Sequence, residues 1–223
     1  MAPDDLIIGL GRTPVPGAAP VGADAKYDPA YEAVEAEIAK LQSVSDDRPD
    51  WAVVADHSRA ILADKSKDLK IATFLCCALY ETEGLCGLQA GLTILTDLIE
   101  TYWDDLFPPL KRVRARANAL GWIANYLADP LAAHKASEAD DEAAVAAYAL
   151  IRQLDGAAAD KLGDQAPLLG EVRRALEQLA QAAEARQKDQ AAKAEAAAKQ
   201  ADAAGQEGSD ETKAAATAPP AAA

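Results

Sequence analysis

Residues 66–92 read SKDLKIATFLCCALYETEGLCGLQAGL, and this stretch decides the fold class. Asp68 can accept hydrogen bonds from the first free amides of a helix, which is the role of an N-cap residue. After it, apolar residues recur at spacings of three and four, as on the buried face of a helix: Leu69, Ala72, Leu75, Cys76 and Leu79. Gly84 is the residue type found most often just past a helix C-terminus. The pattern therefore predicts a buried helix that stops at Gly84.

A second apolar helix is predicted to begin around Gly87. Its buried face follows at helical spacing: Leu88, Leu92, Leu95, Ile99 and Tyr102. Pro108 and Pro109 ensure that this helix has ended, since proline lacks the backbone donor and clashes with the preceding turn. Because the link between the two helices is short, we expect them to be antiparallel neighbours in a bundle.

Two further helices are predicted upstream. Asp28 followed by Pro29 is typical of a helix N-terminus, with aspartate as the N-cap and proline in the first helical position. Asp50 has the same role for the next helix, which is expected to end near Lys65. Short connections between these helices again favour antiparallel packing.

Three more helices are predicted downstream. The first spans about residues 112–127 and stops before Asp129 and Pro130, and the second lies between Asp141 and a weak break that starts at Gly156. The third begins at Leu168, and its apolar face is Leu168, Val172, Leu176 and Leu179. No segment shows the sustained period-two alternation of a strand. The expected fold is all-α, an antiparallel helical bundle of about seven helices with a disordered Ala-rich C-terminal tail.

Composition divides the chain into three regions. Residues 1–26 are rich in proline and glycine, which predicts an extended N-terminal arm, pinned to the body by Leu6, Ile7, Ile8 and Leu10. Residues 27–180 hold the large apolar side chains and form the helical domain. Residues 181–223 are an Ala-rich helical spacer and a disordered linker, the latter from Gly205 onward, because no large apolar side chain there can be buried.

The charge of the chain limits its partners. The formal net charge is −14, so the body repels nucleic acid and anionic lipid at long range. Residues 1–12 lack the basic segment of a signal peptide, and no apolar run approaches the roughly 18 residues that a membrane span needs. Three closely spaced cysteines are a poor disulfide framework and fit a reducing compartment. We expect a cytoplasmic protein.

Catalysis and cofactor binding need a constellation of side chains, and the sequence offers none. A thiol and imidazole pair can be drawn from Cys76 or Cys86 with His57, but core thiols and a rim histidine explain the same residues. Cys76, Cys77 and Cys86 lack the spacing and the fourth ligand of a zinc site. We therefore predict no catalytic residue, no cofactor and no metal site. A helical small-molecule-binding or thiol-dependent enzyme remains the alternative hypothesis.

One local feature suggests a protein-docking surface. The candidate residues are Tyr102, Trp103, Asp104, Asp105, Phe107, Arg112, Arg114 and Arg116. Aromatic residues are enriched in binding hot spots, and the arginines form the dense basic patch of an acidic chain. Two structural explanations compete with docking. The aromatic residues can simply close the core at a helix end, and the arginines can pair with Asp104 and Asp105.

Four pieces of sequence, in order, are similar to the N-terminal domain of the ImpA/TssA family of bacterial type VI secretion proteins. They read GADAKYDP at 22–29, PDW at 49–51, SKDLK at 66–70 and GLCGLQAGL at 84–92, the last followed by YWDDL at 102–106. The resemblance extends from Pro14 to about Leu127, which is about half of the chain.

The resemblance implies a structural role rather than catalysis. Members of this family are assembly proteins of the bacterial cytoplasm, at the inner face of the membrane through partners. The implied partners are baseplate, sheath or tube, and membrane-complex components, and no nucleic acid or membrane insertion is expected. On this reading Asp68 caps a helix, while Ser66 and Lys67 shape the turn before it.

Family members usually carry a C-terminal region that forms rings. These 223 residues end in the predicted linker instead, so we expect an N-terminal fragment or a short variant. Self-association of this chain stays open, and ring formation is expected from a C-terminal region that these residues do not include. A generic helical adaptor unrelated to secretion is the third hypothesis. A gene neighbourhood encoding sheath, tube and baseplate proteins would distinguish it from the secretion module.

Overall fold

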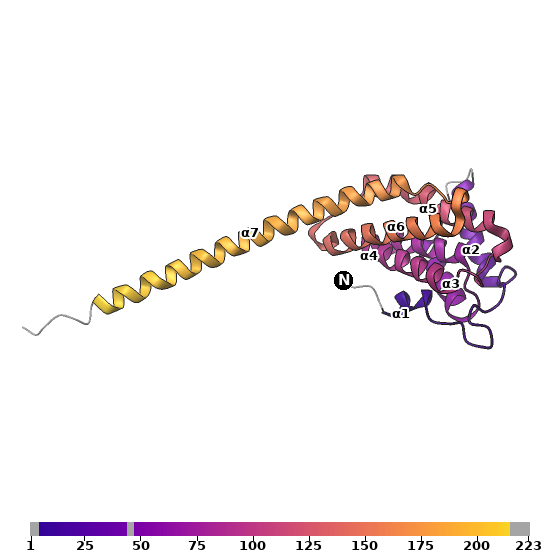
Figure 1. The fold of residues 1–223 in the computed structure, drawn as a ribbon, viewed down its shortest axis with the longest axis horizontal. Helices are drawn as coiled ribbons and strands as arrows, with labels where there is room; N and C mark the ends of the chain where they lie inside the picture. Colours follow the sequence, from indigo (N-terminus) through magenta and orange to yellow (C-terminus); the bar gives the residue numbers. More distant parts are fainter. Residues whose placement is uncertain (1–4, 44–46, 215–223) are drawn as a thin grey trace, which may run out of the picture. The chain divides into compact units, whose positions relative to one another are not determined.

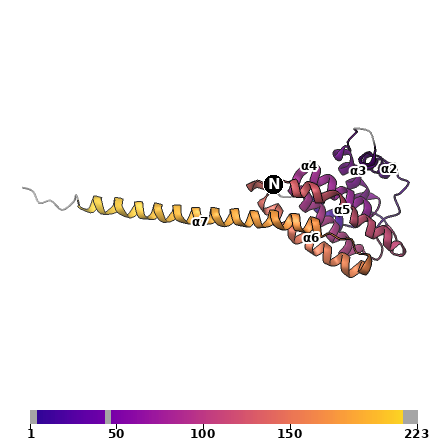
Figure 2. The same cartoon turned by 90° about the horizontal axis from the view of Figure 1, so that it is seen from above.

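The computed structural model describes residues 5–43 and 47–214. In this part of the chain the fold is all-α, as predicted, and only two isolated β-bridges occur outside the helices. Figures 1 and 2 show the helices from directions at right angles. The α-helices are α1 (Asp5–Ile8), α2 (Pro29–Ala39), α3 (Trp51–Asp64), α4 (Leu69–Tyr102), α5 (Val113–Ala133), α6 (Asp141–Leu162) and α7 (Gly170–Ala214). The 3-10 turns are η1 (Gly9–Gly11), η2 (Lys40–Gln42), η3 (Leu110–Arg112), η4 (Glu138–Asp140) and η5 (Gly163–Gln165).

The chain divides into two compact units, Met1–Ala183 and Glu184–Ala223. In the second unit α7 is helical as far as Ala214, whereas the sequence predicted a disordered linker from Gly205. The rest of that predicted linker, residues 215–223, lies outside the described residues. In the spacer, Lys193 and Asp189 form an ion pair of 3.0 Å one helical turn apart.

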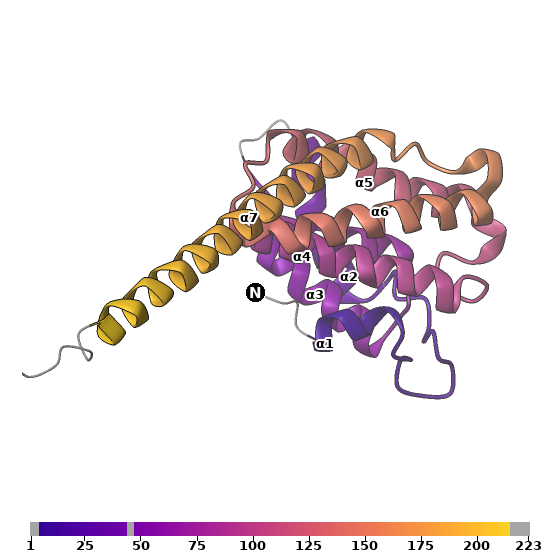
Figure 3. The same ribbon diagram turned by 60° about the vertical axis from the view of Figure 1, so that its left-hand side comes forward.

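Helix α4 forms the centre of the first unit. Most of its residues are buried, including the predicted face of Leu69, Ala72, Leu75, Cys76 and Leu79. Helices α6 and α3 make its most extensive contacts, followed by α5, and α2 packs on α3. Figure 3 shows α6 lying alongside α4. The first unit is therefore organised around α4.

Gly84 divides α4 into two halves, as predicted. Its dihedral angles, φ 64° and ψ −142°, are not helical, and a positive φ strains residues with a Cβ atom. Beyond it the chain turns back. An added Cβ on Gly87 would lie 2.0 Å from the carbonyl oxygen of Leu79, and one on Gly91 would lie 2.5 Å from the Cα of Cys76. From Gly87 to Gly91 the contacts move forward along the second half of α4, while from Leu79 to Cys76 they move backward along the first half. The two halves are therefore antiparallel.

Three aspartates begin helices as predicted. The carboxylate of Asp28 accepts a hydrogen bond from the amide of Ala30 at 2.9 Å, with Pro29 in the first helical position. Asp50 and Asp68 accept hydrogen bonds from two amides each at the starts of α3 and α4. These bonds satisfy donors that the first turn of a helix leaves free.

Residues 65–69, between α3 and α4, hold several segments together. On one side, the amide of Ala23 donates to Lys65 at 3.0 Å, and the amide of Lys67 donates to Val21 at 2.8 Å. On the other side, the amide of Phe107 donates to the carbonyl of Lys67 at 2.9 Å, and the amide of Leu69 donates to Phe107 at 2.8 Å. Main-chain hydrogen bonds thus connect the turn before α4 both to the N-terminal arm and to the turn after α4.

The side chain of Lys67 is fully buried in this region. Its ammonium group donates to the carbonyl of Leu10 at 2.9 Å and to that of Leu62 at 2.5 Å. Burial lowers the pKa of Lys67 to about 8, because a charged amine is disfavoured away from water. The arm contains α1 and η1 rather than being wholly extended. Its partly buried Ile7, Ile8 and Leu10 pack on the core, while the side chain of Leu6 lies outside the described residues.

The downstream helices extend beyond the predicted breaks. Helix α5 continues through Pro130 to Ala133, because Leu131 is buried in the core and the Pro130 carbonyl accepts a hydrogen bond from Tyr80 at 3.2 Å. Helix α6 continues through Gly156 to Leu162, with Leu154 and Ala158 buried on either side of the glycine. Leu168 was predicted to be on the buried face of the last helix but is 91% exposed, and Leu169 is buried in its place.

By length and composition α4 could also cross a membrane. From the sequence, no apolar run of sufficient length was expected. However, 72% of its most apolar window is buried inside the protein. A core helix surrounded by other helices has this composition because it is hydrophobic on all sides.

Gly91→Ala is expected to destabilise the first unit. The new methyl group would lie 2.5 Å from the backbone of Cys76, so the two halves of α4 must separate, at a cost of about 1–3 kcal/mol or more. The matched control is Gly121→Ala in α5, where the nearest atom is 3.5 Å away and the better helix propensity of alanine gives up to about 1 kcal/mol. Urea denaturation measures both, and equal stability of the two variants would contradict the close approach.

Asp68→Asn is expected to remove a pH dependence of stability while keeping the cap. Burial raises the pKa of Asp68 to about 6, above its ordinary value of 3.8. Between these pH values the folded state holds a proton that the unfolded state has released, so the stability contributed by Asp68 is full below pH 3.8 and is lost as the pH rises through 6. The wild type should lose up to about 3 kcal/mol relative to the asparagine variant across that window.

Denaturation curves at a series of pH values test this expectation, and parallel curves for the two proteins would contradict it. Asp68→Ala is the control for the cap itself. Because alanine cannot accept the two amide hydrogen bonds, it should be less stable than the asparagine variant by about 1 kcal/mol.

Candidate protein-docking site

The predicted docking residues follow α4 and continue into the first turns of α5, but they differ in exposure. Asp104 and Asp105 are exposed, and Phe107 is half-buried. Tyr102 and Trp103 are buried. The aromatic residues at the end of α4 therefore close the core, as one of the two explanations from sequence proposed, while the carboxylates remain on the surface.

Tyr102 has a structural hydrogen bond. Its hydroxyl group donates to the carbonyl of Arg12 at 2.6 Å. The guanidinium group of Arg12 also forms an ion pair of 2.6 Å with Asp97. Together these contacts fasten the N-terminal arm to the second half of α4.

Arg116 is a structural residue rather than a docking residue, which corrects the prediction from sequence. Its side chain is 0% exposed. The guanidinium group donates to the carbonyls of Pro108 and Leu106, at 2.7 Å each, and to that of Trp103. It also lies 4.7 Å from the ring centroid of Trp103. Burial lowers the pKa of Arg116, while Asp104 acts in the opposite direction. The sequence shows a dense set of arginines but not which one faces inward.

Arg112 and Arg114 are exposed, as is the neighbouring Lys111. Across the described residues, no ion pair joins these three side chains to Asp104 or Asp105. The pairing expected as a structural explanation is therefore not formed. The surface presents two carboxylates and three cations that all face solvent.

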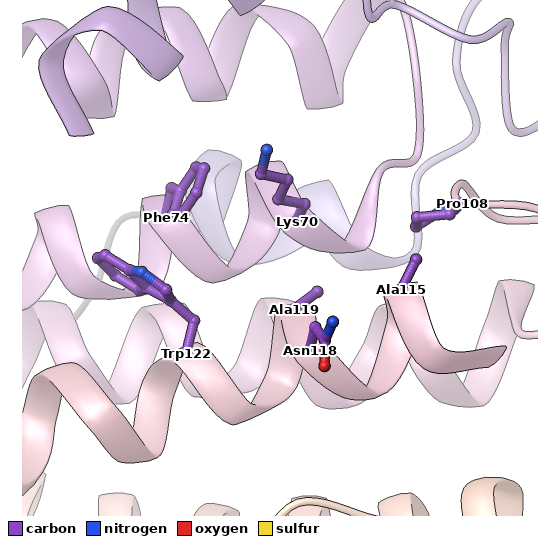
Figure 4. Close-up of a pocket in the computed structure, with 7 residues that line it drawn as sticks. All are labelled: Lys70, Phe74, Pro108, Ala115, Asn118, Ala119 and Trp122. Carbon is purple, nitrogen blue, oxygen red and sulfur yellow. The ribbon is translucent and has the colours of Figure 1, made fainter. Parts of the chain in front are cut away.

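A groove of about 320 Å³ adjoins this surface and was not predicted from sequence. It lies between the first half of α4 and the N-terminal half of α5, and Pro108 of the turn contributes to its wall. Figure 4 shows Phe74 and Trp122 at one end and Pro108 and Ala115 at the other. Helical spacing places Ala115, Ala119 and Trp122 on one face of α5, but only the packing of α5 on α4 makes that face part of a groove.

Aromatic side chains continue from the groove along the surface. Trp122 meets Phe74 edge-on, with ring centroids 4.9 Å apart, and stacks on Tyr126 at 5.0 Å. Trp51 of α3 lies 5.1 Å from Tyr126. Such contacts hold the rings in fixed positions, since aromatic pairs prefer stacked or edge-to-face geometry.

The thiols of Cys76 and Cys77 do not have the environment of a reactive cysteine. Cys76 and Cys77 are fully buried, and burial raises the pKa of both thiols well above the ordinary value. Reactive cysteines instead have lowered pKa values and partial exposure. Cys86 and His57 are half-buried on different helices. Within the described ranges, no cluster of three metal-binding side chains is present.

Comparison with known proteins connects this arrangement with one family. A family model described as "ImpA, N-terminal, type VI secretion system" matches residues 12–125. The chain is 32% identical over 102 residues to the "Type VI secretion system component TssA1" of Pseudomonas aeruginosa. That alignment covers 41% of this chain and 28% of the relative, so the chain matches less than a third of the relative's length.

A solved structure has the same fold. It is the N-terminal domain, including the conserved ImpA_N region, of the TssA component of the type VI secretion system from Burkholderia cenocepacia. The TM-score is 0.67 at 20% sequence identity, and the match covers 85% of this chain and 98% of that chain.

Arg116→Met is expected to destabilise the fold strongly. The change removes hydrogen bonds to three main-chain carbonyls and leaves those carbonyls without donors, at a cost of about 3–5 kcal/mol. Arg114→Met is the matched control, because Arg114 is exposed on the same helix and its loss should change stability by about 0.5 kcal/mol or less. Chemical denaturation followed by circular dichroism separates them. If both variants were equally stable, Arg116 would not have a structural role.

Proposed function

This chain belongs to the ImpA N-terminal family of the type VI secretion system, and we propose that it is a non-catalytic assembly module that docks onto another component of that machine. The docking surface in this proposal comprises the exposed or half-buried part of the turn, Asp104, Asp105 and residues 107–109, with Arg112 and Arg114. Tyr102, Trp103, Leu106 and Arg116 are excluded because they are buried. Baseplate, sheath or tube, and membrane-complex proteins are the candidate partners, and the bacterial cytoplasm is the proposed location.

The unpaired surface charges are the observation that supports this site. Asp104, Asp105, Arg112 and Arg114 are exposed at the end of a turn that Arg116 fixes from inside. A rigid turn presents its charges without the entropic cost of ordering a loop on binding. Charged groups at the rim of an interface mainly control the association rate and the choice of partner. The buried thiols favour this function over the thiol-dependent enzyme.

Arg112→Glu with Arg114→Glu, and separately Asp104→Ala with Asp105→Ala, are expected to weaken docking without unfolding the chain. The purified full chain is tested against individually purified baseplate, sheath, tube and membrane-complex proteins of the same bacterium. Wild type should bind one of them. The double arginine variant should associate at least about tenfold more slowly at low salt, because rim charges steer the encounter. The double alanine variant should mainly lose contacts in the bound state and dissociate faster.

The matched control is Lys135→Glu with Lys161→Glu, which changes the net charge by the same amount as the double arginine variant. Both lysines are exposed outside the proposed surface. Circular dichroism verifies that every variant is folded. If the surface variants bind like wild type, or if the control variant is impaired equally, residues 104–114 are not the docking surface.

A further inference from the structure

The groove beside the turn of residues 103–109 has an aromatic end and a basic end. At the aromatic end, the rings of Trp122 and Phe74 meet in a T-shaped contact, and Phe74 is only 4% exposed. The basic end lies at Pro108 and Ala115 (Figure 4), and the chain between these two lining residues carries three exposed cations, Lys111, Arg112 and Arg114. One end of the groove is therefore bounded by a stretch of chain that carries three exposed cations.

We propose that this groove seats one bulky apolar side chain of a partner segment whose neighbouring residues are acidic. The apolar side chain lies against Phe74 and Trp122, and the carboxylates lie at the basic end. The proposal rests on the docking function above, and it states the chemistry of the partner and the polarity with which the segment binds. This arrangement follows the usual anatomy of an interface, in which an apolar centre is surrounded by a polar rim.

Charge complementarity is the reason for acidic neighbours. The chain has a net charge of −14, yet the groove ends at three bases without ion-pair partners among the described residues. Lys70 at the side of the groove is different, because it already pairs with Glu35 at 2.5 Å. A basic segment would meet unpaired like charges, which costs affinity. An acidic segment would meet cations that need not first release another partner.

The occupant is a different protein rather than a second copy of this chain. A second copy carries a formal charge of −14, so it is repelled at long range far more strongly than a short segment that carries only a few acidic residues. The volume of the groove, about 320 Å³, suits one large side chain of a peptide rather than the face of a second domain. Self-association is therefore an outcome that would count against the proposal.

Binding of short synthetic peptides to the full chain tests the inference. One peptide contains a single Phe among Asp, Glu and Ser residues. A second has Lys in place of the acids, and a third has Ala in place of Phe. The probe is the NMR signal of the Trp122 indole N–H, which Trp122→Phe assigns. The first peptide should give a saturable shift with a Kd of about 1 mM or lower, and the other two should bind at least about tenfold more weakly.

Ala115→Leu fills the groove from its wall and should abolish the shift, whereas Ala132→Leu, at an exposed site on the same helix, should not. Equal binding of the basic peptide, no shift at Trp122, or a dimer that Ala115→Leu dissociates would each overturn the inference. A chain that captures a secretion component but binds no acidic peptide loses this inference and keeps the proposed docking function. A chain that binds the acidic peptide but captures no component loses the proposed function alone.

Discussion

The first unit depends on the turn of residues 65–69, where main-chain hydrogen bonds reach the N-terminal arm on one side and Phe107 on the other. The buried ammonium group of Lys67 completes this junction by donating to carbonyls of Leu10 and Leu62. A buried charge is costly unless hydrogen bonds replace the water that it loses. Burial accordingly lowers the pKa of Lys67. In return, the Lys67 side chain joins three segments that no continuous helix connects: the N-terminal arm, the end of α3 and the turn before α4.

Arg116 is a second buried cation that donates to main-chain carbonyls, here in the turn after the C-terminal end of α4. Lys67 and Arg116 are both fully buried, and both donate to carbonyls of segments that lie outside regular helical hydrogen bonding. Helix ends leave carbonyls without partners, and a buried cation with several donors satisfies more than one of them. As a consequence, the turn after α4 is held from inside, and its fully exposed residues are Asp104 and Asp105. The contacts that stabilise the fold therefore also fix the position of the proposed docking surface.

The region that matches the family also contains the structural features described above. The matched region, residues 12–125, contains the junction at Lys67, the turn, and the N-terminal part of α5 that lines the groove. The buried Cys76 is part of the close packing between the two halves of α4, where it faces Gly91. The distinctive chemistry of the chain is thus at its surface, in separated patches of acids, bases and aromatic rings.

The sequence by itself determined the helical class, the N-caps at Asp28, Asp50 and Asp68, and the break at Gly84, because caps, glycine conformation and helical periodicity are local properties. It also showed which segment concentrates aromatic and charged residues. Only the tertiary structure decided that Arg116 is buried while Arg112 and Arg114 are exposed, and that α5 continues through Pro130. The groove could not be predicted from the sequence either, because its walls come from α4, α5 and Pro108. Which side chains meet across helices depends on how the helices pack, and no local pattern specifies that packing.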